Sequence, residues 1–133
     1  MTVTDAKNLM LGDYVDIGGV EFEEPIVGVI REILQDGNMF GILADRYPYI
    51  SRVEEVFPIK LTKDFFLKNG FEPMGEFPKG VTKLYNKDLV LDVLVTDDDR
   101  FSFWAIGDLK YVHEFQNLLR LRGFDDFADN LKV

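Results

Sequence analysis

Short apolar runs separated by turn residues fill residues 1–61, and they limit the fold more than any other feature of the sequence. The longest run, Ile26–Leu34, is rich in β-branched residues and precedes Asp36-Gly37, a dipeptide typical of tight hairpin turns. Gly18-Gly19 follows an earlier run in the same way. Four or five strands within about 50 residues bury a common face most readily when the sheet curls. The pattern therefore predicts an SH3-like small β-barrel or, as the open alternative, a meander.

The pattern changes at Leu61-Thr62, where a helix start replaces the strand-like runs. Thr62 is a good N-cap for a helix over Lys63–Lys68, and Gly70 lies where a helix commonly ends in a left-handed residue. Three antiparallel strands, a long helix and a short helix are expected to follow, over Thr82–Tyr85, Leu89–Thr96, Phe101–Ile106, Leu109–Arg122 and Asp125–Leu131. We therefore expect an α+β protein with two modules, an acidic β module over residues 1–61 and an α-β-β-β-α module over residues 62–133.

The long C-terminal helix is expected to begin after Asp108 as its N-cap and to end before Gly123. One apolar stripe recurs along it at three- and four-residue spacing and consists of Val112, Phe115, Leu118 and Leu119. We expect this helix to cover one face of the three-stranded sheet. The opposite face of the helix is polar, which predicts exposure of His113, Gln116, Asn117 and Arg120.

The composition excludes several classes of protein. The chain has 133 residues, of which 47% are hydrophobic, so it is not intrinsically disordered. No apolar run approaches the roughly 20 residues that cross a bilayer, and residues 1–8 do not resemble a signal peptide. The absence of cysteine excludes disulfides, thiolate nucleophiles and zinc–thiolate sites. We therefore expect a cytoplasmic protein without membrane association.

The charge of the chain bears on its partners. The formal net charge is −9, and residues 1–61 carry 11 acidic and 5 basic residues. A surface of this sign repels the phosphate backbone, which argues against direct binding of nucleic acid. The same charge can attract a basic protein, so an acidic mimic of nucleic acid is one alternative function.

No motif for nucleophilic catalysis, phosphate binding or metal binding is present. The only histidine is His113, and the only serines, Ser51 and Ser102, lie in predicted strands outside any G-x-S-x-G turn. A second alternative function is a small carboxylate-dependent hydrolase that uses some of Asp13, Asp16 or Glu21 with His113 nearby. We assign no catalytic, cofactor-binding or metal-binding residue, and we expect no cofactor.

The chain is also rich in aromatic residues, which make up 14% of it. Tyr47 and Tyr49 flank a proline, and Phe101, Phe103 and Trp104 follow one another closely. Strand alternation places Phe101 and Phe103 on one face and Trp104 on the other. Exposed aromatic clusters often mark binding sites. The candidate contacts to a partner are Tyr47, Tyr49, Phe101, Phe103, Trp104 and His113.

Three stretches of the sequence together resemble a known group of proteins. They are Leu11–Val15 (LGDYV), Val53–Thr62 (VEEVFPIKLT) leading to Lys68–Phe71 (KNGF), and Tyr111–Leu118 (YVHEFQNL) with Leu121–Gly123 (LRG). In this order they resemble short uncharacterised proteins carried by prophages and mobile elements of gut anaerobic bacteria. Lys60 stands where a second proline is usual in that family, and Phe115 stands where leucine is usual. The resemblance implies an accessory protein in a bacterial cytoplasm and transfers no activity.

These observations favour a non-enzymatic module that binds a protein partner. Aromatic residues are abundant, whereas a catalytic set is missing. The carboxylate-dependent hydrolase and the nucleic-acid mimic remain the alternatives. The sequence does not identify the partner.

Overall fold

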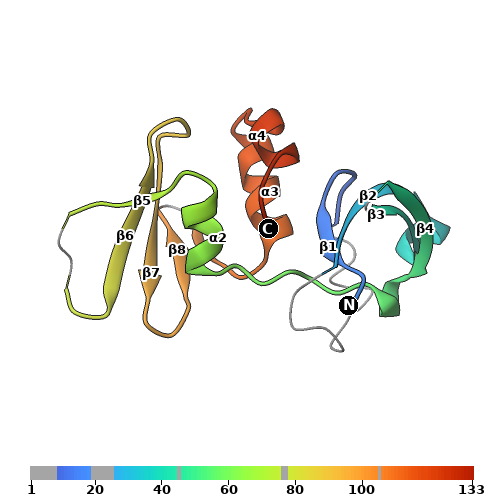
Figure 1. Ribbon diagram of the computed structural model, residues 1–133, viewed down its shortest axis with the longest axis horizontal. Coiled ribbons are helices and arrows are strands. Elements are labelled where there is room, and N and C mark those ends of the chain that lie inside the picture. Colours follow the sequence, from blue (N-terminus) through green and yellow to red (C-terminus); the bar gives the residue numbers. More distant parts are fainter. Residues whose placement is uncertain (1–8, 19–25, 45, 76–77, 105) are drawn as a thin grey trace. The chain divides into compact units, whose positions relative to one another are not determined.

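The computed structural model describes residues 9–18, 26–44, 46–75, 78–104 and 106–133. The chain divides into two compact units, and it passes from one to the other three times. The first unit combines Met1–Ile59 with Tyr111–Asp129, and the second combines Lys60–Lys110 with Asn130–Val133. Figure 1 labels the α-helices and most of the strands of both units.

The first unit contains a four-stranded antiparallel sheet with the order β1-β2-β3-β4. Its strands are β1 (Tyr14–Asp16), β2 (Val27–Leu34), β3 (Met39–Ala44) and β4 (Tyr47–Arg52). Within the described residues the sheet is open, because its outer strands β1 and β4 do not pair with each other. The expected closed barrel is therefore wrong, and the strands form the meander that was its alternative.

Two short 3-10 helices connect parts of this sheet. The helix η2 (Gln35–Gly37) joins β2 to β3, and its Asp36 and Gly37 have φ values of 56° and 90°, as a tight reversal of the chain requires. The helix η3 (Val53–Glu55) follows β4. Beyond η3, Phe57 forms an isolated antiparallel bridge to Asp16 at the end of β1.

The core of the first unit follows from strand alternation. Phe40, Ile42 and Ala44 alternate along β3 as buried residues, whereas their neighbours are only partly buried. The buried cluster under the sheet consists of Leu9, Val15, Ile30, Phe40, Ile42, Val53 and Val56. The expected strand-like runs thus supply the core of this unit.

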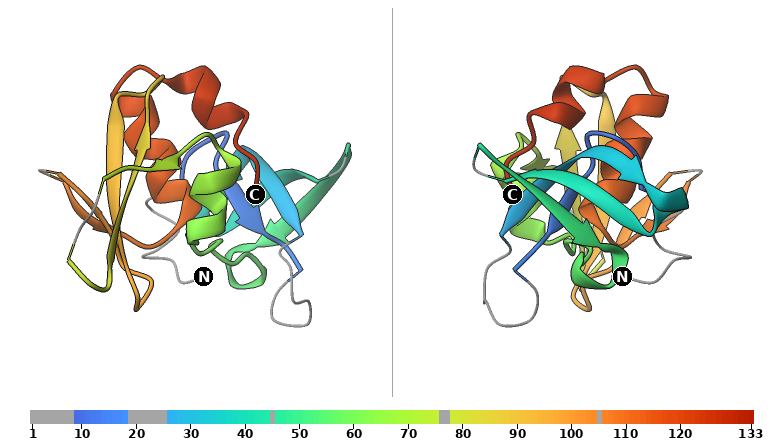
Figure 2. Two further views of the ribbon diagram at one scale, coloured as in Figure 1. Left: turned by 60° about the vertical axis from the view of Figure 1, so that its left-hand side comes forward. Right: turned by 90° about the vertical axis from the view of Figure 1, so that its right-hand side faces the viewer.

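The first unit also contains the helices α3 (Val112–Leu121) and α4 (Asp125–Asp129), which pack against each other (Figure 2). The predicted end of α3 is confirmed, since Gly123 has a φ of 83° and the Phe124 N–H donates to the Leu119 carbonyl at 2.8 Å. The predicted start at Asp108 is wrong. The helix begins three residues after the end of the strand that contains Asp108, and Glu114 accepts the Tyr111 N–H at 2.9 Å.

The polar face of α3 is largely buried, which corrects a second expectation. His113 and Gln116 are buried, and the side chain of Arg120 is mostly covered. The polar pattern did not predict exposure, because Gln116 and Arg120 have polar partners elsewhere in the first unit.

The second unit contains a five-stranded antiparallel sheet with the order β5-β6-β7-β8-β9. Its strands are β5 (Glu72–Pro73), β6 (Val81–Asn86), β7 (Leu91–Thr96), β8 (Phe101–Phe103) and β9 (Gly107–Leu109). The three predicted strands are confirmed as β6, β7 and β8. The short flanking strands β5 and β9 were not expected, because two- and three-residue strands carry almost no periodic signal.

The short helix α2 (Lys63–Lys68) covers one face of this sheet. Its predicted cap is confirmed, since Thr62 Oγ1 accepts the Phe65 N–H at 3.0 Å. Phe66 of α2 packs on Phe71, Phe101 and Phe103, with ring centroids 5.1, 5.4 and 6.1 Å apart. The helix expected to cover this sheet was the long one, whereas α3 is grouped with the first unit.

The C-terminal residues complete the second unit. The Asn69 side chain donates to the carbonyls of Phe65 and Lys132, at 2.7 Å each, and its oxygen accepts the Lys132 N–H at 2.8 Å. Leu131 is buried beside this contact. In the described part of the chain, no helix combines the length and the hydropathy that crossing a bilayer requires.

Candidate functional site

Three of the six predicted contact residues are exposed. Trp104 is 87% exposed, Tyr47 is 65% exposed and Tyr49 is 48% exposed. Burying a large apolar side chain away from water is favourable. The exposed indole of Trp104 is therefore a candidate contact for a partner. Contact of these three residues with a partner stays a prediction.

The other three predicted contact residues are buried. Phe101 and Phe103 lie on the face of the sheet that α2 covers. His113 lies in the first unit and stacks on Tyr111, with ring centroids 5.7 Å apart and planes 8° apart. The expectation that their side chains are available to a partner is therefore wrong. The two phenylalanines support the surface from within the core instead.

Strand alternation determines which residues occupy the other face of the five-stranded sheet. Since Leu84, Val93 and Phe103 point into the core, their neighbours point outward. The register aligns one outward residue from each of four adjacent strands in a single row: Lys83, Leu94, Ser102 and Asp108. We call this outward side the open face.

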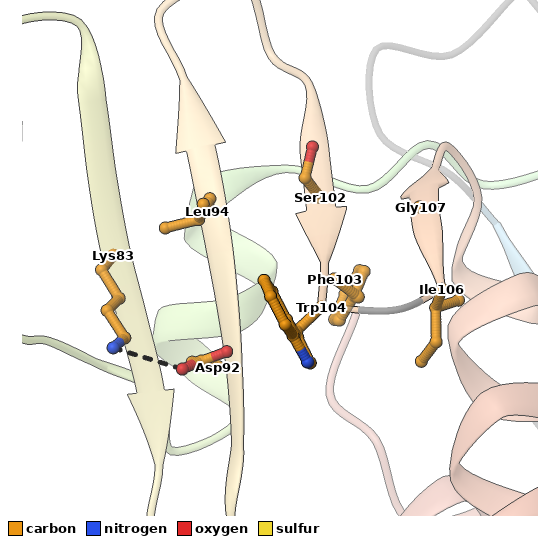
Figure 3. Close-up of a pocket in the computed structure, with 8 residues that line it drawn as sticks. All are labelled: Lys83, Asp92, Leu94, Ser102, Phe103, Trp104, Ile106 and Gly107. Carbon is orange, nitrogen blue, oxygen red and sulfur yellow. Dashed lines mark ion pairs between the residues drawn. The ribbon is translucent and has the colours of Figure 1, made fainter.

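A groove of about 670 Å³ lies on the open face. Its lining includes Lys83, Asp92, Leu94, Ser102, Trp104 and Ile106 (Figure 3). Trp104 follows the last residue of β8, and its indole stands beside β7 near Asp92 in the close-up. Trp104 and Ile106 are both exposed, so they provide much of the accessible apolar surface of the groove.

The charged side chains of the open face form ion pairs within the chain. Lys83 Nζ lies 3.3 Å from an Asp92 carboxylate oxygen, and Arg100 lies 3.0 Å from Asp108. Asp108 also accepts a hydrogen bond from the Ser102 hydroxyl. The hydrogen bonds from Ser102 and from Arg100 lower the pKa of Asp108 below its ordinary value. The lowered pKa keeps the Asp108 carboxylate charged beside Arg100, and each of the two ion pairs joins a basic with an acidic side chain.

Tyr47 and Tyr49 lie on β4, an edge strand that is exposed along most of its length. They are paired with Ala44 and Ile42 of β3. The tyrosines therefore lie on the same face of the sheet as these buried residues, at its exposed edge. Pro48 lies between them and has no N–H to donate to another strand. This feature makes β4 a poor edge for pairing with a further strand.

Asp13 is buried and has two partners. Its carboxylate accepts the Met10 N–H at 2.8 Å and forms an ion pair with Arg120 of α3. Burial raises the pKa of Asp13, and the hydrogen bond from Arg120 opposes this shift. Arg120 also donates to Asn117 at 3.0 Å and lies 3.5 Å from an Asp129 oxygen. The ion pair therefore connects the approach to β1 with α3.

Gln116 connects the same segments by hydrogen bonds. Its side-chain oxygen accepts the Tyr14 N–H at 2.8 Å, and its amide donates to the carbonyls of Gly12 and Ala128, at 3.2 and 3.0 Å. The Tyr14 hydroxyl donates to the Asp129 carbonyl at 2.7 Å. Gly12, Asp13 and Tyr14 thus meet Gln116 and Arg120 in one structural network, which brings together two of the stretches on which the resemblance rests.

The other hydrolase candidates do not join this network. Asp16 accepts the N–H groups of Gly18 and Ile26, at 2.8 and 3.1 Å, and so closes a turn. Glu21 lies outside the described residues. Within the described residues, no group of three or more His, Asp or Glu side chains is arranged to hold a metal ion.

The sequence did not identify the groove residues around Trp104. Alternation within β7 is sufficient to place Asp92 and Leu94 on the outward face once Val93 is taken as buried. The neighbours of that strand depend on cross-strand register, which the turns determine. Ile106 and Gly107 were placed at the end of a strand and in a connection, although a tight turn returns the chain here as β9.

Comparisons of the chain with protein-family models, with curated proteins and with solved structures find no match. The groove beside Trp104 and the network around Asp13 are the two features on which a function can be argued.

Proposed function

We propose that this chain is a non-enzymatic module that binds a protein partner on the open face of the five-stranded sheet. The observation that carries the proposal is the exposed Trp104 beside the groove. Covering an indole of about 200 Å² contributes about 5 kcal/mol by area, before the costs of association. Tryptophan is also among the residues most often found at the energetic centre of protein interfaces.

The network around Asp13 has a structural role in this proposal. Asp13 is engaged by the Met10 N–H and by Arg120, and Asp16 closes a turn. A general base or nucleophile needs a carboxylate that can reach a substrate. No observation therefore favours the hydrolase over the binding module.

The net charge of the chain affects how readily a partner associates with it. A net charge of −9 attracts a basic protein over a distance of about 10 Å at ordinary ionic strength. It repels nucleic acid at the same range. We therefore propose a protein whose overall charge is positive and whose contact area is centred on Trp104.

We also propose that the first unit is related to SH3-like sheets in open form. Support comes from the order of its elements, since the 3-10 helix η3 follows β4 and Phe57 then bridges to β1. The resemblance in the sequence adds the proposal of an accessory protein of a prophage or mobile element, acting in a bacterial cytoplasm.

A quantitative capture experiment tests the binding function. The wild-type chain, Trp104→Ala and Leu121→Ala are immobilised separately and exposed to lysate of the native host. Leu121 is a matched control because it is also an exposed, large apolar residue but lies on α3. We expect one protein to be retained by the wild type and by Leu121→Ala, and to be lost with Trp104→Ala. The retained protein is then purified and its Kd measured for all three chains.

Two outcomes would overturn the proposal. One is that purified candidate partners bind Trp104→Ala as tightly as the wild type. The other is turnover of a small substrate that depends on Asp13 or Asp16 while no protein binds. Competition by DNA that is lost at high salt would instead favour the nucleic-acid mimic.

A further inference from the structure

The groove beside Trp104 is electrically neutral although the chain is strongly acidic. Lys83 and Asp92, on the neighbouring strands β6 and β7, form an ion pair in the lining of the groove, and Arg100 and Asp108 form one next to it. A charged group that entered this site would lose hydration, and the oppositely charged group nearest to it already has a partner. The contact surface therefore discriminates against charged side chains, whatever the long-range field of the molecule.

The apolar side chains of the groove favour an apolar ligand. Leu94 lies in the middle of the row, the Trp104 indole stands beside β7 near Asp92, and Ile106 lies beside β9. These three residues provide apolar surface for which an apolar side chain is the complementary partner.

The polar groups of the groove argue against a sugar. Recognition of a sugar needs stacking on an aromatic ring together with several polar groups that are available for its hydroxyls. Here the Ser102 hydroxyl donates to Asp108, and Asp92 pairs with Lys83. A sugar would have to replace these contacts, whereas an apolar side chain would leave them in place.

The size of the row indicates the length of the ligand. Neighbouring strands lie about 4.8 Å apart, so a row across four strands spans about 14 Å, which is the length of about four residues of extended chain. The row from Lys83 to Asp108 crosses four strands.

We infer that the groove takes a short, uncharged, apolar segment of the partner protein, with one large side chain of that segment packed on the Trp104 indole. This inference rests on the proposed function and names the part of the partner that the site recognises.

Random peptides displayed on phage test the inference. Peptides are selected on the full-length wild-type chain, and those that also bind Trp104→Ala are removed. Enriched peptides are synthesised and titrated against the wild-type chain and its variants by isothermal titration calorimetry. Trp104 is the only tryptophan, so its fluorescence reports directly on occupancy of the groove when the peptide contains no tryptophan.

We expect enriched peptides to share an uncharged core of about four residues with at least one large apolar side chain. Replacing that side chain by lysine should weaken binding at least about tenfold, and Trp104→Ala should weaken it about thirtyfold. Leu121→Ala should leave the affinity unchanged. The affinity should vary less than about threefold between about 0.05 M and about 0.5 M salt, because a neutral contact is not screened.

The remaining outcomes separate this inference from the proposed function. Enriched peptides with a charged core that still require Trp104 would overturn the inference and leave the binding module standing. Quenching of Trp104 by cellohexaose without any peptide binding would overturn it in favour of a sugar. Failure to enrich any peptide that depends on Trp104 would overturn it as well, and the capture experiment would then decide the proposed function independently.

Discussion

Arg120 neutralises a buried carboxylate in the first unit. It is the ion-pair partner of the fully buried Asp13. We expect Arg120→Ala to lower the free energy of unfolding by about 3–5 kcal/mol, because a buried charge is left uncompensated. Urea unfolding followed by circular dichroism measures this loss.

Two control variants make the Arg120 prediction specific. Arg120→Lys keeps the positive charge and should lose less stability than Arg120→Ala. Arg100→Ala removes an ion pair on the exposed surface and should leave the unfolding midpoint nearly unchanged. Equal stability of Arg120→Ala and the wild type would show that Asp13 does not depend on this pair.

The titration of Asp13 gives a second prediction. Burial raises its pKa above the ordinary 3.8, so between that value and the folded pKa the folded chain holds more protons than the unfolded chain. The stability contributed by Asp13 therefore increases as the pH falls through this window, and it is lost as the pH rises through the folded pKa.

Asp13→Asn is the variant that isolates this effect, because asparagine has nearly the same size as aspartate but does not titrate. We expect the stability of the wild type relative to Asp13→Asn to increase as the pH falls from about 7 to about 4. Urea unfolding of both chains at each pH measures it. His113 also acts on Asp13, so a His113→Gln background serves as control. A decrease over the same range would contradict the prediction.

At the scale of elements, Asn69 connects α2 with the C-terminal residues. Its side chain bonds to the Phe65 carbonyl and to both backbone groups of Lys132. We expect Asn69→Ala to destabilise the chain by about 1–3 kcal/mol, since it removes one buried and two part-buried hydrogen bonds to the backbone. Amide hydrogen exchange at Lys132 should become faster. Asn38→Ala, at an exposed asparagine, is the matched control and should change neither measurement.

Local signals predicted several element boundaries correctly. The cap of α2 at Thr62 and the end of α3 at Gly123 depend on residues within a few positions of each other. The start of α3 was wrong because Asp108 is held by Ser102 and Arg100 on neighbouring parts of the sheet. Such contacts depend on the tertiary fold, and a capping pattern does not record them.

Exposure was harder to predict than secondary structure. Gln116 and His113 were placed on a solvated face because they are polar, yet both are buried. The hydrogen-bond partners of Gln116 include Tyr14, which is 102 positions away in the sequence. The groove beside Trp104 was missed for a related reason, since its residues come from four strands whose register the sequence alone does not determine.

At the scale of the whole molecule, the chain does not divide into two consecutive parts. Residues 111–129 belong to the first unit, and residues 130–133 belong to the second. The predicted boundary after residue 61 lies near the first passage between units, at Ile59–Lys60, but the prediction kept the C-terminal helices with residues 62–110.

A fragment of residues 1–61 tests the difference between these divisions. Without α3 it lacks Gln116 and Arg120, the partners of Tyr14 and of buried Asp13. We expect the fragment to show poorly dispersed amide resonances, because a buried charge without its partner is costly. Adding a peptide of residues 111–133 should restore dispersion. Native-like spectra of the fragment alone would favour the predicted boundary.

The interleaved path of the chain also bears on how the protein is made. A ribosome releases residues 60–110 before residues 111–129, so all five strands and α2 of the second unit emerge while the first unit still lacks its helices. Since domains tend to fold as soon as their residues are available, residues 60–110 are expected to become compact during translation before residues 1–59 gain α3 and α4.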